Sequence, residues 1–68
     1  MKYIVEYDAY QNETGIVEVE AESVSKAKYA AFKKLIEDGV LIKNAQFILF
    51  LKYIFCRVWT EDGYRAWN

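Results

Sequence analysis

The stretch SVSKAKYAAFKKLIEDG, residues 23–39, decides the fold of this chain because it has the features of a complete amphipathic helix. Ser23 is a good N-cap, since its hydroxyl can accept a hydrogen bond from an amide of the first turn, and Gly39 can take the left-handed conformation that ends a helix. The sequence therefore predicts a helix over residues 24–38. At about 100° per residue, one narrow apolar stripe runs along it and consists of Val24, Ala27, Ala31 and Leu35. The small side chains in this stripe allow the helix axis to lie close to a sheet.

A second apolar strip lies beside the first on the same helix and consists of Tyr29, Phe32 and Ile36. The apolar arc is therefore wider than contact with one sheet requires, and something else has to cover it. The cover is either another segment of the same chain, or a partner protein or second copy. Tyr29 and Phe32 are accordingly candidate interface residues.

Two strands are predicted before the helix. Residues 2–10 alternate between apolar and polar side chains, as in a half-buried strand, with Ile4 as the exception on the polar side. Residues 11–15 include Gly15 and suit a hairpin loop. Residues 16–21 alternate again, so the two strands are expected to pair antiparallel.

Residues 45–60 are the hardest segment to assign, because they contain neither Gly nor Pro and are apolar on nearly every side. A single strand of that length would be far longer than the usual five or six residues. We predict a short helix over residues 45–52, capped by Asn44, and then a strand over residues 54–60. One face of this helix would cover the second apolar strip, and it consists of Phe47, Phe50, Leu51 and Ile54. The alternative is two strands joined by a tight turn near residues 52–53.

The last segment has the pattern of a β-hairpin. Asp62 and Gly63 suit the positive φ angles of a tight turn, and residues 64–67 would form a short last strand. The predicted fold class is α+β: an antiparallel sheet of about four strands packed on one main helix, in the order β-β-α-(short α)-β-β. The length of 68 residues predicts a single domain, residues 1–68. The order of the strands within the sheet is left open.

The composition argues against catalysis. The chain has no histidine, which removes the commonest general base near neutral pH and the commonest metal ligand. Its single cysteine, Cys56, alternates with Ile54 and Val58 as a small core residue would, and the sequence offers no recognisable base to activate it. We therefore expect no catalytic residue, no cofactor and no metal site, and we expect that the protein is not an enzyme.

Charge and hydropathy restrict the location and the partners. The single cysteine and the lack of a signal-peptide pattern indicate a cytoplasmic location, and the most apolar run, residues 45–55, is too short to span a membrane. The net charge is −1, but residues 1–22 carry one Lys against six acids, and residues 23–52 carry six Lys against two acids. Because the helix lysines are spread around the axis, we expect a solvated helix face and do not expect nucleic acid as a partner.

The sheet face that points away from the helix is the main candidate for a binding surface. In the predicted register it carries aliphatic, aromatic and Arg side chains, namely Ile4, Ile16, Phe55, Arg57 and Trp59. Such a mixture is typical of the centres of protein interfaces, and the alternative is partial cover by neighbouring side chains on a small sheet. Trp59 and Arg57 are the first anchor candidates, because Trp and Arg contribute a large share of binding energy at interfaces.

Several stretches resemble small proteins of phages and mobile elements. Residues 17–35, VEVEAESVSKAKYAAFKKL, look like the strand-to-helix passage of such proteins, and FILFLKYI followed by CRVW resembles their short helix leading into a strand. In size and element order the chain is also similar to some single-domain anti-CRISPR proteins, and EDGYRAW, residues 61–67, resembles the closing hairpin of one such inhibitor. The resemblance implies a non-enzymatic, phage-encoded inhibitor that binds a nuclease effector complex. It carries over no individual binding residue.

The leading hypothesis is therefore a non-enzymatic protein-binding module that occupies a surface on a host protein or complex. The first alternative is a homodimeric structural or accessory protein, which buries the same apolar surface against itself. The second alternative is a weak nucleic-acid binder that uses the Lys-rich helix.

Overall fold

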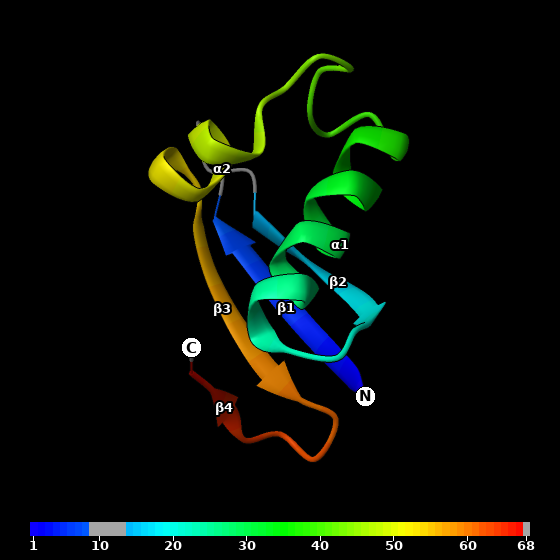
Figure 1. Cartoon of the computed structure of the whole chain (residues 1–68), viewed down its shortest axis with the longest axis vertical. Helices are drawn as coiled ribbons and strands as arrows, with labels where there is room; N and C mark the ends of the chain where they lie inside the picture. Colours follow the sequence, from blue (N-terminus) through cyan, green and yellow to red (C-terminus); the bar gives the residue numbers. More distant parts are fainter. Residues whose placement is uncertain (9–13, 68) are drawn as a thin grey trace.

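The computed structural model of the chain describes residues 1–8 and 14–67, and its fold is the predicted α+β class (Figure 1). In chain order the elements are β1 (Lys2–Asp8), β2 (Thr14–Glu20), α1 (Val24–Glu37), α2 (Phe47–Tyr53), β3 (Phe55–Thr60) and β4 (Arg65–Ala66). Within the described residues, the strands form one antiparallel sheet in the order β2-β1-β3-β4. α1 lies across one face of this sheet, and α2 lies at the end where β3 begins (Figure 1).

The core lies between α1 and the middle of the sheet. Val5 of the central strand β1 pairs with Val17 of β2 on one side and with Val58 of β3 on the other, and all three side chains are buried. α1 packs on these three strands with the predicted stripe, whose buried members are Ala27, Ala31 and Leu35. The alanines are fully buried because their small side chains bring the helix axis close to the sheet.

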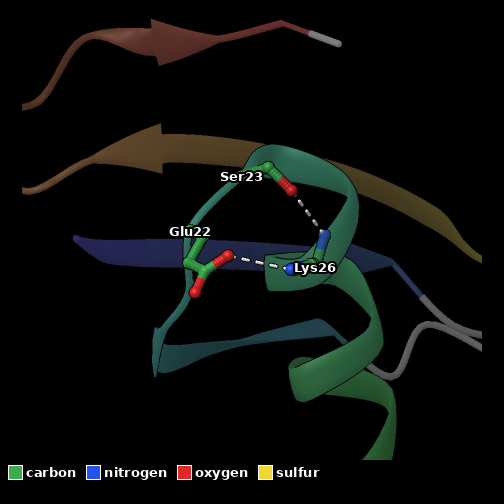
Figure 2. Close-up of polar contacts among 3 residues, drawn as sticks. All are labelled: Glu22, Ser23 and Lys26. Atoms are coloured by element: carbon green, nitrogen blue, oxygen red, sulfur yellow. Dashed lines mark hydrogen bonds and ion pairs between the residues drawn. The ribbon is translucent and has the colours of Figure 1, made fainter.

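The ends of α1 have the predicted caps. The Ser23 hydroxyl accepts a hydrogen bond from the Lys26 amide at 3.2 Å, and the Lys26 ammonium pairs with the Glu22 carboxylate at 2.9 Å (Figure 2). The helix ends one residue earlier than predicted, with Asp38 as the C-cap. Gly39 follows at a φ of +79°, in the left-handed region that favours glycine.

α2 confirms the predicted short helix and excludes the alternative of two strands, but it begins two residues later than predicted. Asn44 is not its N-cap, because the first turn is closed by the Gln46 carbonyl, which accepts the Phe50 amide at 3.0 Å. Phe47 and Phe50 face α1 as predicted. Leu51 is exposed instead of joining this face, because it is turned about 100° from Phe50 around the helix axis.

β2 begins earlier than predicted, and the predicted loop over residues 11–15 overlaps its first two residues. Residues 9–13, which include the rest of that loop and the end of the predicted first strand, lie outside the described residues. Gly15 pairs with Tyr7, and a Cβ at Gly15 would lie only 2.8 Å from the Tyr7 Cζ. Glycine therefore makes room for an aromatic ring within the strand pair here and does not mark a turn.

β3 and β4 form the predicted hairpin at the end of the chain. Gly63 has a φ of +89°, and the Thr60 amide donates to the Tyr64 carbonyl at 2.7 Å. β4 is shorter than predicted, since only Arg65 and Ala66 pair with β3. The hairpin places Arg65 directly opposite Trp59 at the edge of the sheet.

Candidate protein interface

The face of the sheet that points away from α1 is the surface on which most of the predicted interface residues lie. We call it the outer face, and its residues are Lys2, Ile4, Glu6, Asp8, Thr14, Ile16, Glu18, Glu20, Phe55, Arg57, Trp59 and Arg65. They alternate along the strands with the buried residues of the opposite face. Of the described helices, α1 packs on that opposite face and α2 lies at the end of the sheet (Figure 1), so the outer face is left open to solvent.

The outer face brings together five of the predicted interface residues. Ile4 lies at its centre, between Glu18 of β2 and Trp59 of β3, and is half-buried by these neighbours. Ile16 and Phe55 lie on either side, with 69% and 55% of their surface exposed. The predicted side of the sheet is therefore confirmed for these residues, because one residue of slip would have put their side chains in the core.

A carboxylate joins the polar and aromatic groups of the outer face. The Glu6 carboxylate accepts a hydrogen bond from Trp59 Nε1 at 3.2 Å, and the same oxygen lies 3.5 Å from Arg57 Nη1. The Arg57 guanidinium also lies over the Phe55 ring, with 4.8 Å between Cζ and the ring centroid. Three neighbouring side chains of β3 are thus held by one another and by Glu6, which reduces the rotamer freedom they would lose on binding.

Arg65 and Trp67 extend this arrangement across β4. The Arg65 Cζ lies 5.7 Å from the centroid of the Trp59 ring and 4.3 Å from that of Trp67, and Trp67 is 74% exposed. Neither residue was among the predicted interface residues. Alternation of Arg65 and Trp67 within the predicted last strand, with Arg65 opposite Trp59 in the hairpin, is the signal that would have found them.

Tyr29 and Phe32 do not belong to this surface, because both lie on α1, on the opposite side of the sheet. Phe32 is wrong as an interface residue: only 5% of its surface is exposed. The centroid of its ring lies 5.2 Å from the ring centroid of Phe47 and 5.2 Å from that of Phe50, so α2 covers it. Tyr29 packs edge-on against Phe47 at 5.0 Å and keeps about half of its surface exposed. The second apolar strip is thus covered mainly by the chain itself.

A second group of exposed apolar side chains, which was not among the predicted interface residues, lies on several sides of α2 and in the segment before it. We call it the α2 patch, and its exposed side chains are Ile42, Ile48, Leu49, Leu51 and Tyr53. It adjoins a shallow hollow of about 210 Å³, lined almost entirely by apolar groups, between residues 41–46 and α2. The patch exists because every side of residues 47–51 is apolar, while a helix of two turns can bury only one side against α1.

Cys56 lies on the face of the sheet that carries the core, as predicted for a small core residue, and it is partly buried. Burial raises the pKa of the Cys56 thiol above its ordinary value, and the positive charge of Lys28 opposes this effect in part. The thiol is therefore protonated at neutral pH, which makes it a weak nucleophile. In the described part of the chain, no three side chains of His, Cys, Asp or Glu are grouped to hold a metal ion, and no helix is long and apolar enough to cross a membrane.

Comparisons of the chain with protein-family models, with curated proteins and with solved structures found no match. The fold class and the geometry of the two exposed surfaces are therefore the basis for inferring what the protein does.

Proposed function

We propose that this chain is a non-enzymatic protein-binding module that contacts its partner through the outer face of the sheet. The observation that carries the proposal is the row of Phe55, Arg57 and Trp59 on one strand, held in place by Glu6 on an open sheet face. Arg and Trp are the side chains that most often carry the binding energy of protein interfaces. The exposed Ile16 adds apolar surface on the far side of Glu6.

The charges near this surface support a protein partner better than nucleic acid. The β2 side of the outer face carries Glu18 and Glu20, which would repel a phosphate backbone. Two lysines of α1 already have acceptors within the chain: Lys26 pairs with Glu22 at 2.9 Å, and Lys34 donates to the Glu18 carbonyl at 3.5 Å. The basic helix therefore has fewer unengaged lysines than its sequence suggests.

The kind of partner follows from the resemblance to small proteins of phages and mobile elements. The resemblance implies that the partner is a protein or complex of a bacterial host, which the chain would inhibit or modulate by occupying one of its surfaces. The contact surface does not depend on that identity, because it consists of side chains of the outer face alone.

Site-specific photo-cross-linking in a bacterial lysate tests the proposal. A photoreactive p-benzoylphenylalanine at position 55 replaces an exposed ring with another ring, so the fold should be retained. We expect one dominant cross-linked product. Excess unlabelled wild-type protein should suppress it, and excess Arg57→Ala protein should suppress it at least about tenfold less effectively, because an anchor residue contributes about 2 kcal/mol or more.

The matched control carries the same photoreactive residue at position 48, since Ile48 is 72% exposed on the α2 patch. A specific outer-face contact gives no such product at position 48. Equal products at positions 48 and 55, or a product that the Arg57→Ala protein suppresses as well as wild type, would contradict the proposal.

Self-association is a second candidate function, and the α2 patch is the observation that favours it. Exposed apolar side chains gathered on one short helix are typical of a protein interface, and a second copy of the chain would present the same patch. The α2 patches of the two copies would then form the contact of a structural homodimer.

Light scattering on a size-exclusion column across a dilution series tests self-association. A dimer that dissociates in Leu49→Lys but not in Ile16→Lys would assign the contact to the α2 patch, because both residues are exposed but lie on different surfaces. A monomer at the highest concentration would exclude this candidate.

A further inference from the structure

We propose that Arg65 forms a carboxylate-binding site on the outer face, which receives an acidic side chain or the chain-terminal carboxylate of a bound protein. The inference rests on the proposed function, since it names the chemical group that the partner presents to this surface. It is carried by the unpaired donors of Arg65, by the two indole rings beside it, and by the distribution of charge across the sheet.

The donors of Arg65 have no acceptor in the described part of the chain. Its Nε is buried and makes no hydrogen bond, and the ion pairs found among the described residues join other groups. Most buried donors in folded proteins form a hydrogen bond, so the free Nε–H sets Arg65 apart from the other side chains of the sheet. The other arginine of the chain, Arg57, is ion-paired with Glu6, with 3.5 Å between Nη1 and Oε1.

Two indole rings fix the Arg65 guanidinium. Its Cζ lies 4.3 Å from the Trp67 ring centroid and 5.7 Å from that of Trp59. Stacking on an aromatic ring leaves the planar donors of an arginine free to form paired hydrogen bonds with a carboxylate. The apolar rings also displace water beside the charge, which strengthens an ion pair formed there.

The charges of the outer face favour a carboxylate on a protein over a phosphate backbone. The sheet order puts the acids of β2 at one edge and Arg65 on β4 at the other, with Glu6 between them already engaged by Arg57 and Trp59. Arg65 therefore lies at the edge away from the β2 acids, and none of the ion pairs found among the described residues includes it. A single carboxylate fits this edge, whereas an extended phosphate row would run across the acidic edge as well.

Nuclear magnetic resonance can test the site with few signals, because the chain has only two arginines, Arg57 and Arg65, and two tryptophans. We would titrate the ¹⁵N-labelled protein with sodium acetate at constant ionic strength, with sodium chloride as the matched salt. We expect the Arg65 Nε–Hε signal to shift saturably with acetate and not with chloride. The Arg57 signal should move much less, since its guanidinium is already paired.

The matched variants are Arg65→Lys, which keeps the charge but loses the planar donors, and Arg57→Lys. In Arg65→Lys we expect the Trp67 indole signal to lose its acetate-dependent shift, with apparent affinity reduced about tenfold or more. The Trp59 indole signal reports whether the fold is intact, because its Nε1–H is bonded to Glu6. Arg57→Lys should leave the acetate response of Arg65 unchanged.

Equal, unsaturating shifts of both arginines with acetate would overturn the proposal. A stronger response of Arg65 to inorganic phosphate and to a short DNA oligonucleotide than to acetate would also overturn it, in favour of nucleic acid.

Photo-cross-linking at position 55 separates a failure of the carboxylate site from a failure of the proposed protein interface. If cross-linking persists in Arg65→Lys while acetate does not bind, the carboxylate site fails and the protein interface stands. If acetate binds to Arg65 but no cross-link forms at position 55, the protein interface fails and only the affinity of Arg65 for a carboxylate stands.

Discussion

The Trp59 indole donates its Nε1–H to the Glu6 carboxylate at 3.2 Å, between two residues that are 53 positions apart in the sequence. The pairing of β1 with β3 brings them together, because Glu6 lies opposite Arg57 and two residues along β1 from Ile4, the partner of Trp59. The same carboxylate oxygen also pairs with Arg57, so the side chains of the candidate interface are fixed only after the sheet has formed.

Replacing Glu6 tests how far this contact stabilises the sheet. We expect Glu6→Ala to lower the free energy of unfolding by about 1 kcal/mol, since it removes one hydrogen bond and one partly exposed ion pair. Glu6→Gln, which keeps an acceptor oxygen, should have a smaller effect. Urea denaturation followed by tryptophan fluorescence measures both. Glu18→Ala is the control on the same face, and an equal loss there would show that the Glu6 contacts add nothing.

Phe50 tests the packing of α2 on α1. Only 3% of its surface is exposed, and its ring centroid lies 5.2 Å from that of Phe32. Phe50→Ala should lower the free energy of unfolding by about 3–5 kcal/mol, which approaches the whole stability of so small a domain. Because a loss of this size can unfold the whole domain, Phe50→Leu provides a graded change with a smaller loss.

The matched control for Phe50 is Ile48→Ala on the exposed side of the same helix. Its effect on urea denaturation should stay within about 0.5 kcal/mol of wild type. If Ile48→Ala destabilised the protein as strongly as Phe50→Leu, the α2 patch would be covered in solution, and self-association would have to be measured at the same protein concentration.

Ser23 tests the start of α1. Ser23→Ala removes the acceptor for the Lys26 amide and should lower the free energy of unfolding by about 1 kcal/mol. Ser23→Asp restores an acceptor and should recover most of the loss. Thermal denaturation followed by circular dichroism compares the three proteins. An Ala variant as stable as wild type would mean that the Glu22–Lys26 ion pair or water replaces the cap.

Cys56 gives a pH dependence whose sign follows from burial. The folded state holds the pKa of the Cys56 thiol above its ordinary value, so the unfolded chain loses this proton first as the pH rises. The contribution of Cys56 to stability is therefore fully present below the pKa of the unfolded thiol, about 8.5, and is lost as the pH rises towards the folded pKa.

The measurement is urea denaturation of wild type and Cys56→Ala between pH 7 and 10. The stability difference between the two should shift against wild type as the pH rises above about 8.5, because only wild type carries the thiol. Other groups that titrate in this range are common to both proteins and cancel. Parallel pH profiles would contradict the raised pKa of Cys56.

Elements with a strong local signal could be predicted from the sequence. Ser23 and Gly39 bound α1 because capping depends on residues within one turn of the helix end. Alternation along residues 2–8 and 55–60 assigned each side chain to its face of the sheet, since a strand has a period of two. Gly63 marked the hairpin because its φ of +89° suits glycine.

Elements whose signal depends on distant contacts were predicted less well. Gly15 was assigned to a loop, whereas it lies in β2 because the Tyr7 ring needs its space. The start of α2 was placed at residue 45, since an apolar run has no internal mark of where a helix begins. For Phe32 the sequence left two kinds of cover open, another segment of the chain or a partner, and the packing of Phe47 and Phe50 on its ring decides for the chain.

The sequence by itself determined the α+β class, the order of the elements and the outward side of β1, β2 and β3, because periodicity and capping are local properties. The tertiary structure alone decided the order β2-β1-β3-β4, which puts Arg65 and Trp67 beside Trp59 and leaves the acids of β2 at the other edge. Strand order depends on pairing between residues far apart in the chain, such as Glu6 and Arg57, and no local pattern records it.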